Sequence, residues 1–138
     1  LRMFLAMHGL GRFWVDFQRL GWRSLEHLCD ADDHELRRLA REIGIPVGDQ
    51  YVLMRAIRSA LSAKHFVVAQ GLRDKLSRFA ECGVFSIEDL VDPEKMPDEF
   101  LRDEIQLPPL KIRRFRHEVE RYHESNLRRA RRLSQHTF

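Results

Sequence analysis

The sequence of 138 residues is poor in cysteine and in long apolar runs, and each scarcity excludes a class of protein. Its two cysteines, Cys29 and Cys82, are too few for a disulfide framework or for a four-cysteine zinc site. No uncharged run approaches the roughly 18 apolar residues that a membrane-spanning helix requires. With 43% apolar and 33% charged residues, the chain is expected to be neither disordered nor fibrous. We therefore expect a globular protein of a reducing, cytoplasmic compartment, without a transmembrane segment.

The sequence also lacks the residue patterns that catalysis and metal binding need. Residues 30–34 have the opening spacing of a calcium loop, but Glu35 stands where that loop requires glycine. The pair His117-Glu118 is followed by Arg121, where a zinc-protease helix requires a second histidine. Neither cysteine has a neighbour that would activate its thiolate, so both are expected to be small buried side chains. We expect no catalytic residue, no metal ligand, no cofactor and no enzymatic activity.

The net charge of +3, from 24 basic and 21 acidic residues, is unevenly distributed. Residues 1–62 carry a net charge of +1, and residues 63–124 carry −2. Residues 125–138 carry +4, from four arginines and no acidic side chain. The positive balance therefore lies in a basic C-terminal tail. Together with an acidic stretch in the first unit and a basic helix start in the second, this distribution suits the joining of like molecules better than the coating of a nucleic acid.

An internal repeat with an offset of 62 residues organises the chain. Paired glycines and prolines in one register occur rarely by chance, unlike paired leucines, so they carry the alignment. The matches continue without a gap, which predicts one domain over residues 1–62, a second over 63–124 and a basic helical tail over 125–138. The matched pairs include Gly9 with Gly71, Phe17 with Phe79, Gly21 with Gly83, Ser24 with Ser86, Asp30 with Asp92, Ile43 with Ile105 and Pro46 with Pro108.

Each unit has the pattern of a bundle of five short helices. Apolar side chains recur at three- and four-residue steps, and no stretch alternates with the period of two that a strand requires. In the first unit Ser24 and Asp32 stand where N-caps belong, and Gly21 and Gly44 stand where helices end. The predicted fold is all-α, with two consecutive five-helix bundles. Four of the five helices can be located in each unit: over residues 10–20, 24–29, 32–43 and 47–61 in the first, and over 72–79, 86–90, 100–105 and 112–122 in the second.

The connections between these helices extend the prediction. Residues 59–69 contain neither glycine nor proline, so the last helix of the first unit can run as a continuous helix into the first helix of the second. The final helix can extend beyond Tyr122 through the arginines of the tail, where apolar residues become sparse. Trp14 falls on an apolar stripe and is expected in the core. Trp22 follows Gly21 and is expected to be partly exposed.

Glycine and apolar residues recur in the same order and at the same spacing in the two units. In the first unit they are Phe4-Leu5, Gly9-Leu10, Phe13, Phe17, Gly21, Leu25, Leu28, Leu36, Gly44-Ile45, Gly48, Leu53 and Ile57. In its order and spacing, the chain from about Phe4 to about Tyr122 resembles a tandem pair of sterile alpha motif (SAM) domains. The second unit departs at Lys75, where an aromatic residue is usual, at Gln106, where the family prefers glycine, and at Leu110, where glycine often precedes the last helix.

The resemblance implies a non-enzymatic function, in protein–protein interaction. SAM domains are mostly protein-interaction modules of scaffold and signalling proteins, and they join head to tail. The mid-loop surface of one domain, around its second to fourth helices, meets the end-helix surface of the next, at the start of its fifth helix. The resemblance therefore implies head-to-tail homo-oligomerisation, or scaffolding with another SAM-domain protein. Because the chain begins at Leu1 and not at methionine, we expect a segment of a larger intracellular protein.

Two charged stretches fall where the resemblance places these surfaces. The mid-loop candidates are acidic and lie in the first unit, together with Trp22: Asp30, Asp32, Asp33 and Glu35. The end-helix candidates are basic and lie in the second unit: Lys111, Arg113, Arg114 and Arg116. Complementary charges would align such a contact. The alternative is that both stretches are ordinary solvated helix ends, since acidic side chains favour helix N-termini in any case.

Two other partners use basic residues of the same region. A minority of SAM domains bind RNA hairpins near the start of the last helix, so RNA-hairpin binding is the alternative function. Base recognition would need an exposed aromatic side chain, but Phe115 and Tyr122 share the apolar stripe of Ile112 and Val119. The arginines of the tail can also add weak attraction to an anionic membrane. These arginines are Arg128, Arg129, Arg131 and Arg132.

Overall fold

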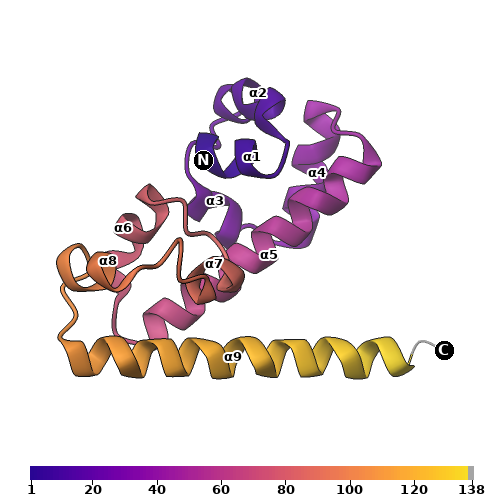
Figure 1. Cartoon of the computed structure of the whole chain (residues 1–138). Helices are drawn as coiled ribbons and strands as arrows, with labels where there is room; N and C mark the ends of the chain where they lie inside the picture. The colour runs from indigo at the N-terminus through magenta and orange to yellow at the C-terminus, as the bar shows by residue number, and fades with distance from the viewer. Residues whose placement is uncertain (137–138) are drawn as a thin grey trace. The chain divides into compact units, whose positions relative to one another are not determined.

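The computed structural model describes the backbone of residues 1–136 and the side chains of residues 1–133. Within this range every regular element is an α-helix or a short 3-10 helix, and no residue is in a strand (Figure 1). The predicted all-α class is confirmed. The chain divides into two compact units, one ending at Ser62 and the other beginning at Ala63.

Unit 1 packs its helices around an apolar centre. Phe4, Phe17 and Leu28 are fully buried there, and Leu53 is almost so. At the apolar burial energy of about 25 cal/mol per Å², side chains of this size contribute roughly 1.5–3 kcal/mol each, which is what holds these short helices together. The elements of unit 1 are α1 (Arg2–Met7), a 3-10 helix (Gly11–Phe13), α2 (Trp14–Arg19), α3 (Leu25–Asp30), α4 (Asp33–Ile43) and the first part of α5 (Val47–Ala69).

Unit 2 has a core of interlocking aromatic rings. The Phe66 and Phe115 ring centroids lie 5.6 Å apart in an edge-to-face arrangement, and the Phe79 and Phe115 rings stack at 6.3 Å. Tyr122 packs against Phe66 at 5.5 Å. The elements of unit 2 are the last part of α5, a 3-10 helix (Arg73–Lys75), α6 (Leu76–Glu81), α7 (Ile87–Val91), α8 (Asp98–Asp103) and α9 (Pro109–His136).

The 62-residue repeat is present in the backbone as well as in the sequence. The two 3-10 helices, then α2 and α6, and then the starts of α5 and α9 are each separated by that offset. Left-handed backbone conformations recur in the same register. They pair Gly9 with Gly71, Gly21 with Gly83, and Gly44 with Gln106.

Side-chain caps set several helix starts at the predicted positions. The Ser24 hydroxyl accepts a hydrogen bond from the His27 backbone N–H at 3.3 Å, and Ser86 does the same for the Asp89 N–H at 3.1 Å. The Asp32 carboxylate accepts from the Glu35 N–H at 2.8 Å. Such caps satisfy N–H groups that have no partner within the helix. By contrast α8 follows Pro97, without a side-chain cap, and has six residues against the eleven of α4.

Gln106 adopts the left-handed conformation that Gly44 adopts in unit 1, with φ of 63° against 82°. This conformation costs a residue with a Cβ roughly 1–2 kcal/mol. We expect Gln106→Gly to raise the free energy of unfolding by about 0.5–1 kcal/mol, the remainder being offset by the greater freedom of glycine in the unfolded chain. Urea unfolding followed by circular dichroism measures this change.

Gly44→Ala is the matched control, because a Cβ at Gly44 would meet no atom within 4 Å and only the backbone would be strained. That variant should be destabilised by about 1–2 kcal/mol. If Gln106→Gly were also less stable than the parent, the Gln106 side chain would have to make contacts that outweigh its backbone strain.

Helix α5 runs without interruption from Val47 to Ala69, so the predicted continuous helix is confirmed. Helix α9 continues beyond Tyr122 to His136, so the predicted extension of the last helix is confirmed. Beyond Tyr122 its apolar side chains are exposed, with 44% of Leu127 and 67% of Leu133 accessible to solvent.

Three local predictions were wrong. Residues 10–20 and 72–79 are not single α-helices: each begins with a 3-10 helix, over Gly11–Phe13 and Arg73–Lys75, which α2 and α6 then follow. Trp14 is half-buried, since the Arg2 guanidinium covers its ring at 4.9 Å where core packing was expected. Cys82 is exposed because it is the C-cap of α6, where the chain leaves the helix, and Cys29 is only half-buried.

Candidate functional site

The start of α9 carries three exposed cations, Lys111, Arg113 and Arg114, which we call the α9 cation cluster. The helix begins here because Pro109 takes its first position, where no backbone N–H is needed. None of the three side chains makes an ion pair or hydrogen bond among the described residues. Leu110, in the same turn, is 79% exposed. The cluster is therefore a cationic surface with an apolar side chain at its edge.

The cluster opposes the electrostatics of its own helix. Partial positive charge gathers at a helix N-terminus, so each cation there costs about 0.3–1 kcal/mol at an exposed site. The first turn of α9 holds no acidic residue that would offset this cost. At the equivalent position of α5 the chain has Asp49, whose carboxylate pairs with Arg12. The fold itself thus accommodates an anion at this position, and cations are not needed to build the helix.

Arg116 does not belong with the cluster, although the sequence grouped it there. Its Nε donates a hydrogen bond to Asp98 Oδ1 at 2.7 Å, and its Nη2 donates to the Met96 carbonyl oxygen. Its side chain is only 26% exposed. These contacts tie α9 to the start of α8, so Arg116 holds unit 2 together and offers little to a partner.

The acidic candidates of unit 1 surround the start of α4 and have different surroundings. Asp32 caps the helix, and Asp33 pairs with Arg58 at 3.3 Å. Glu35 is exposed, and its carboxylate makes no ion pair or hydrogen bond among the described residues. Asp30 ends α3 and is exposed as well. The four carboxylates therefore form a continuous acidic stretch, part of whose charge is already met by Arg58.

Trp22 lies in the connection between α2 and α3. Its backbone N–H donates to the Phe17 carbonyl at 2.9 Å, which closes the end of α2. Its side chain is half-buried, as the sequence predicted. Part of the indole therefore remains accessible.

A groove in unit 1 brings together residues that the sequence did not indicate as a site. It lies between α4 and the first part of α5 and has a volume of about 780 Å³. Four arginines line it, two from each helix, so we call it the arginine groove. Its lining also includes exposed Tyr51 and Val47. The arginines are Arg37, Arg41, Arg55 and Arg58.

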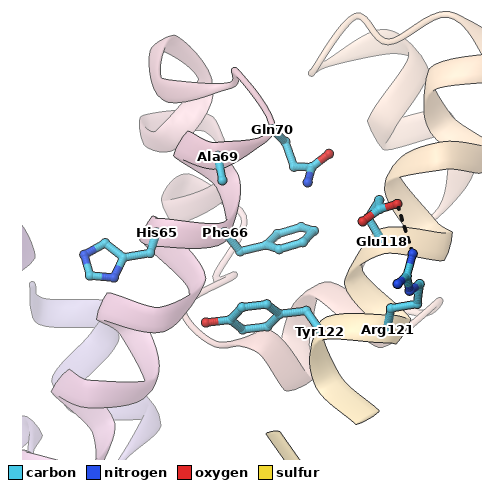
Figure 2. Close-up of a pocket in the computed structure, with 7 residues that line it drawn as sticks. All are labelled: His65, Phe66, Ala69, Gln70, Glu118, Arg121 and Tyr122. Atoms are coloured by element: carbon cyan, nitrogen blue, oxygen red, sulfur yellow. Dashed lines mark ion pairs between the residues drawn. The ribbon is translucent and has the colours of Figure 1, made fainter. Parts of the chain in front are cut away.

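A second pocket, of about 520 Å³, lies within unit 2 between the end of α5 and the middle of α9. Figure 2 shows the Phe66 and Tyr122 rings next to each other there, tilted by 52°, with His65 directed away from them. On the α9 side Glu118 and Arg121 pair with each other at 4.0 Å. The two charged side chains of the pocket thus partly neutralise each other.

The described part of the chain contains no group of side chains suited to a metal ion and no helix suited to crossing a membrane. No group of three or more histidine, cysteine or acidic side chains there is arranged to hold a metal ion. None of the described helices combines the length and the apolar character needed to cross a membrane. Compared with protein-family models, with curated proteins and with solved structures, the chain has no match.

Proposed function

We propose that this chain is a protein-interaction segment made of two SAM-like modules, which join copies of the chain head to tail. In this proposal the α9 cation cluster of one copy contacts the acidic start of α4 in the next. The observation that carries it is the set of three exposed cations without an intramolecular partner among the described residues, at a helix start where they destabilise their own helix. The repeat of helices and left-handed turns at an offset of 62 residues supports two modules of the same kind.

Charge complementarity favours this pairing. Carboxylates brought to the start of α9 would meet both the cations and the positive end of the helix dipole. Leu110 would add apolar contact at the edge of the charged surface. Because the two surfaces differ, the contact is heterologous, and it closes into a ring or continues as a filament. Self-association or scaffolding is therefore the predicted activity, with no chemical step.

RNA-hairpin recognition at the same place has less support. Phe115 is 3% exposed and lies among the core rings, and Tyr122 packs on Phe66. The start of α9 therefore offers phosphate contacts but no exposed aromatic ring for stacking of bases.

Light scattering of the 138-residue chain over a range of concentrations tests the proposal. We expect the average mass to rise with concentration up to the high micromolar range. Replacing Arg113 and Arg114 by glutamate should weaken association about tenfold or more, because like charges would then face each other. Arg128→Glu with Arg129→Glu makes the same change of charge on the tail of α9 and should leave association unchanged.

A charge exchange sharpens the test. Asp33→Lys with Glu35→Lys should abolish association alone, and mixing this variant with the Arg113→Glu, Arg114→Glu variant should restore it. Asp32 is left intact because it caps α4. A chain that stays monomeric at every concentration would overturn self-association. A mixture that fails to assemble would overturn the pairing of these two surfaces.

A further inference from the structure

The arginine groove holds more cationic side chains than the nearby carboxylates neutralise. Arg37 and Arg41 are four residues apart on α4 and so share one face of that helix. On α5, Arg55 and Arg58 face them across the groove. Of these four side chains only Arg58 has an ion pair among the described residues, with Asp33 at 3.3 Å. Three guanidinium groups on two walls of one groove are therefore available to an anion.

The groove also contains an exposed aromatic ring. Tyr51 is 73% exposed and precedes Arg55 by one helical turn, so the ring and the guanidinium share a face of α5. The other lining groups are mostly small or polar, including the hydroxyls of Ser59 and Ser62. Val47 and Met54 supply the remaining apolar surface. The groove thus combines cations, an exposed ring and hydroxyl groups.

We propose that the arginine groove binds single-stranded RNA. The guanidinium groups of both walls would contact successive phosphates, and Tyr51 would stack on a base, which is the combination that single-strand binding proteins use. The serine hydroxyls can hydrogen-bond ribose 2′-hydroxyls, which distinguishes RNA from DNA. This proposal is independent of self-association, since it uses residues outside the α9 cation cluster and outside the acidic stretch, apart from the Arg58–Asp33 ion pair.

Other anionic partners fit the groove less well. An acidic helix in an apolar groove would need several apolar contacts one turn apart, and the groove offers few beyond Val47 and Met54. An anionic membrane would need a cationic surface that a bilayer can reach, whereas these arginines line a recess between two helices. A flexible single-stranded RNA, which carries one phosphate for each nucleotide, can follow such a recess.

The test is the fluorescence anisotropy of a labelled uridine RNA of about twelve nucleotides, within the usual site size of single-strand binding proteins, titrated with the whole chain. Arg37→Gln with Arg41→Gln should lower the slope of log affinity against log salt by about 0.7 for each phosphate that is no longer neutralised. Tyr51→Ala should weaken binding about five- to hundredfold, whereas Tyr51→Phe, which keeps the ring, should bind as the parent does. The matching thymidine DNA and a blunt RNA duplex should both bind more weakly.

Three controls make the result decisive. Arg128→Gln with Arg129→Gln removes equal charge from the tail of α9 and should change affinity less than the groove variant does. If it changed affinity equally, or if Tyr51→Ala bound as tightly as the parent, the groove would not be the site. If polyglutamate of equal charge or anionic vesicles displaced the RNA at equal charge concentration, the groove would be a general anion site and the proposal would be wrong. Circular dichroism confirms that each variant remains folded.

Discussion

Phe115→Ala is expected to destabilise unit 2 by about 3–5 kcal/mol, as large aromatic truncations in well-packed cores do. Phe115 is 3% exposed, and its ring centroid lies 5.6 Å from that of Phe66 and 6.3 Å from that of Phe79. The substitution would leave a cavity that rings on two other helices cannot fill without abandoning their own packing. A unit of fewer than about 80 residues is only marginally stable, so this destabilisation approaches its whole stability.

Urea unfolding and amide hydrogen exchange measure this effect. Amide groups of α6 to α9 should lose protection, and the urea midpoint should fall. Leu110→Ala is the control on the same helix, because Leu110 is 79% exposed and should change stability by less than about 0.5 kcal/mol. A destabilisation below about 1 kcal/mol for Phe115→Ala would mean that the aromatic rings rearrange to fill the space.

The second large effect is expected at Asp89, which is only 8% exposed. Its carboxylate accepts a hydrogen bond from the buried Phe85 backbone N–H at 3.0 Å and one from Lys95 Nζ at 2.6 Å. Asp89→Ala would remove both of these hydrogen bonds and the ion pair with Lys95 from a largely buried position, and we expect a destabilisation of about 2–3 kcal/mol. Asp103→Asn, which removes an exposed carboxylate from a pair with Arg102, should leave the urea midpoint unchanged.

The same contacts predict a pH dependence. Burial alone would raise the pKa of Asp89, but the hydrogen bonds from Lys95 and Phe85 and the charge of Lys95 outweigh it, and the pKa lies below its ordinary value. The folded protein therefore binds fewer protons at this group than the unfolded chain does. The stabilisation is fully present above the unfolded pKa of about 3.9 and is lost as the pH falls through the lower folded value.

Urea unfolding as a function of pH checks this sign. The difference in stability between the parent and Asp89→Ala should be constant from about pH 5 to 8 and should shrink below about pH 4. If the difference instead grew at low pH, the carboxyl would be protonated in the folded state, and its hydrogen bonds would have to be assigned differently.

Comparing equivalent positions of the two units shows which features the fold needs and which can vary. Asp89 corresponds to His27 in unit 1, which is exposed, and Lys111 corresponds to Asp49. The backbone turns and helix starts are the same at these positions, but the charges differ. The cationic start of α9 therefore reflects a property of unit 2 alone, which is why we connect it with a partner and not with folding.

Local patterns in the sequence were sufficient to predict the repeat, several helix caps and most of the helices, but not α1 or the 3-10 helices that precede α2 and α6. Ser24 and Asp32 cap helices through backbone groups three residues away, so the signals that define these ends are local. Exposure of Lys111, Arg113 and Arg114 could be predicted too, because Ile112 and Phe115 turn the opposite face of α9 toward the core. Patterns of three to four residues carry this information without any knowledge of the tertiary structure.

Which charged groups are engaged and which are available follows from the packing of the helices. Arg116 lies on the same helix turn as Arg114, but Asp98 and the Met96 carbonyl come within its reach once α8 packs on α9. The arginine groove arises because α4 and the first part of α5 lie side by side, although their arginines are far apart in the sequence. An ion pair or a groove depends on distances between helices, and no periodicity within one helix contains those distances.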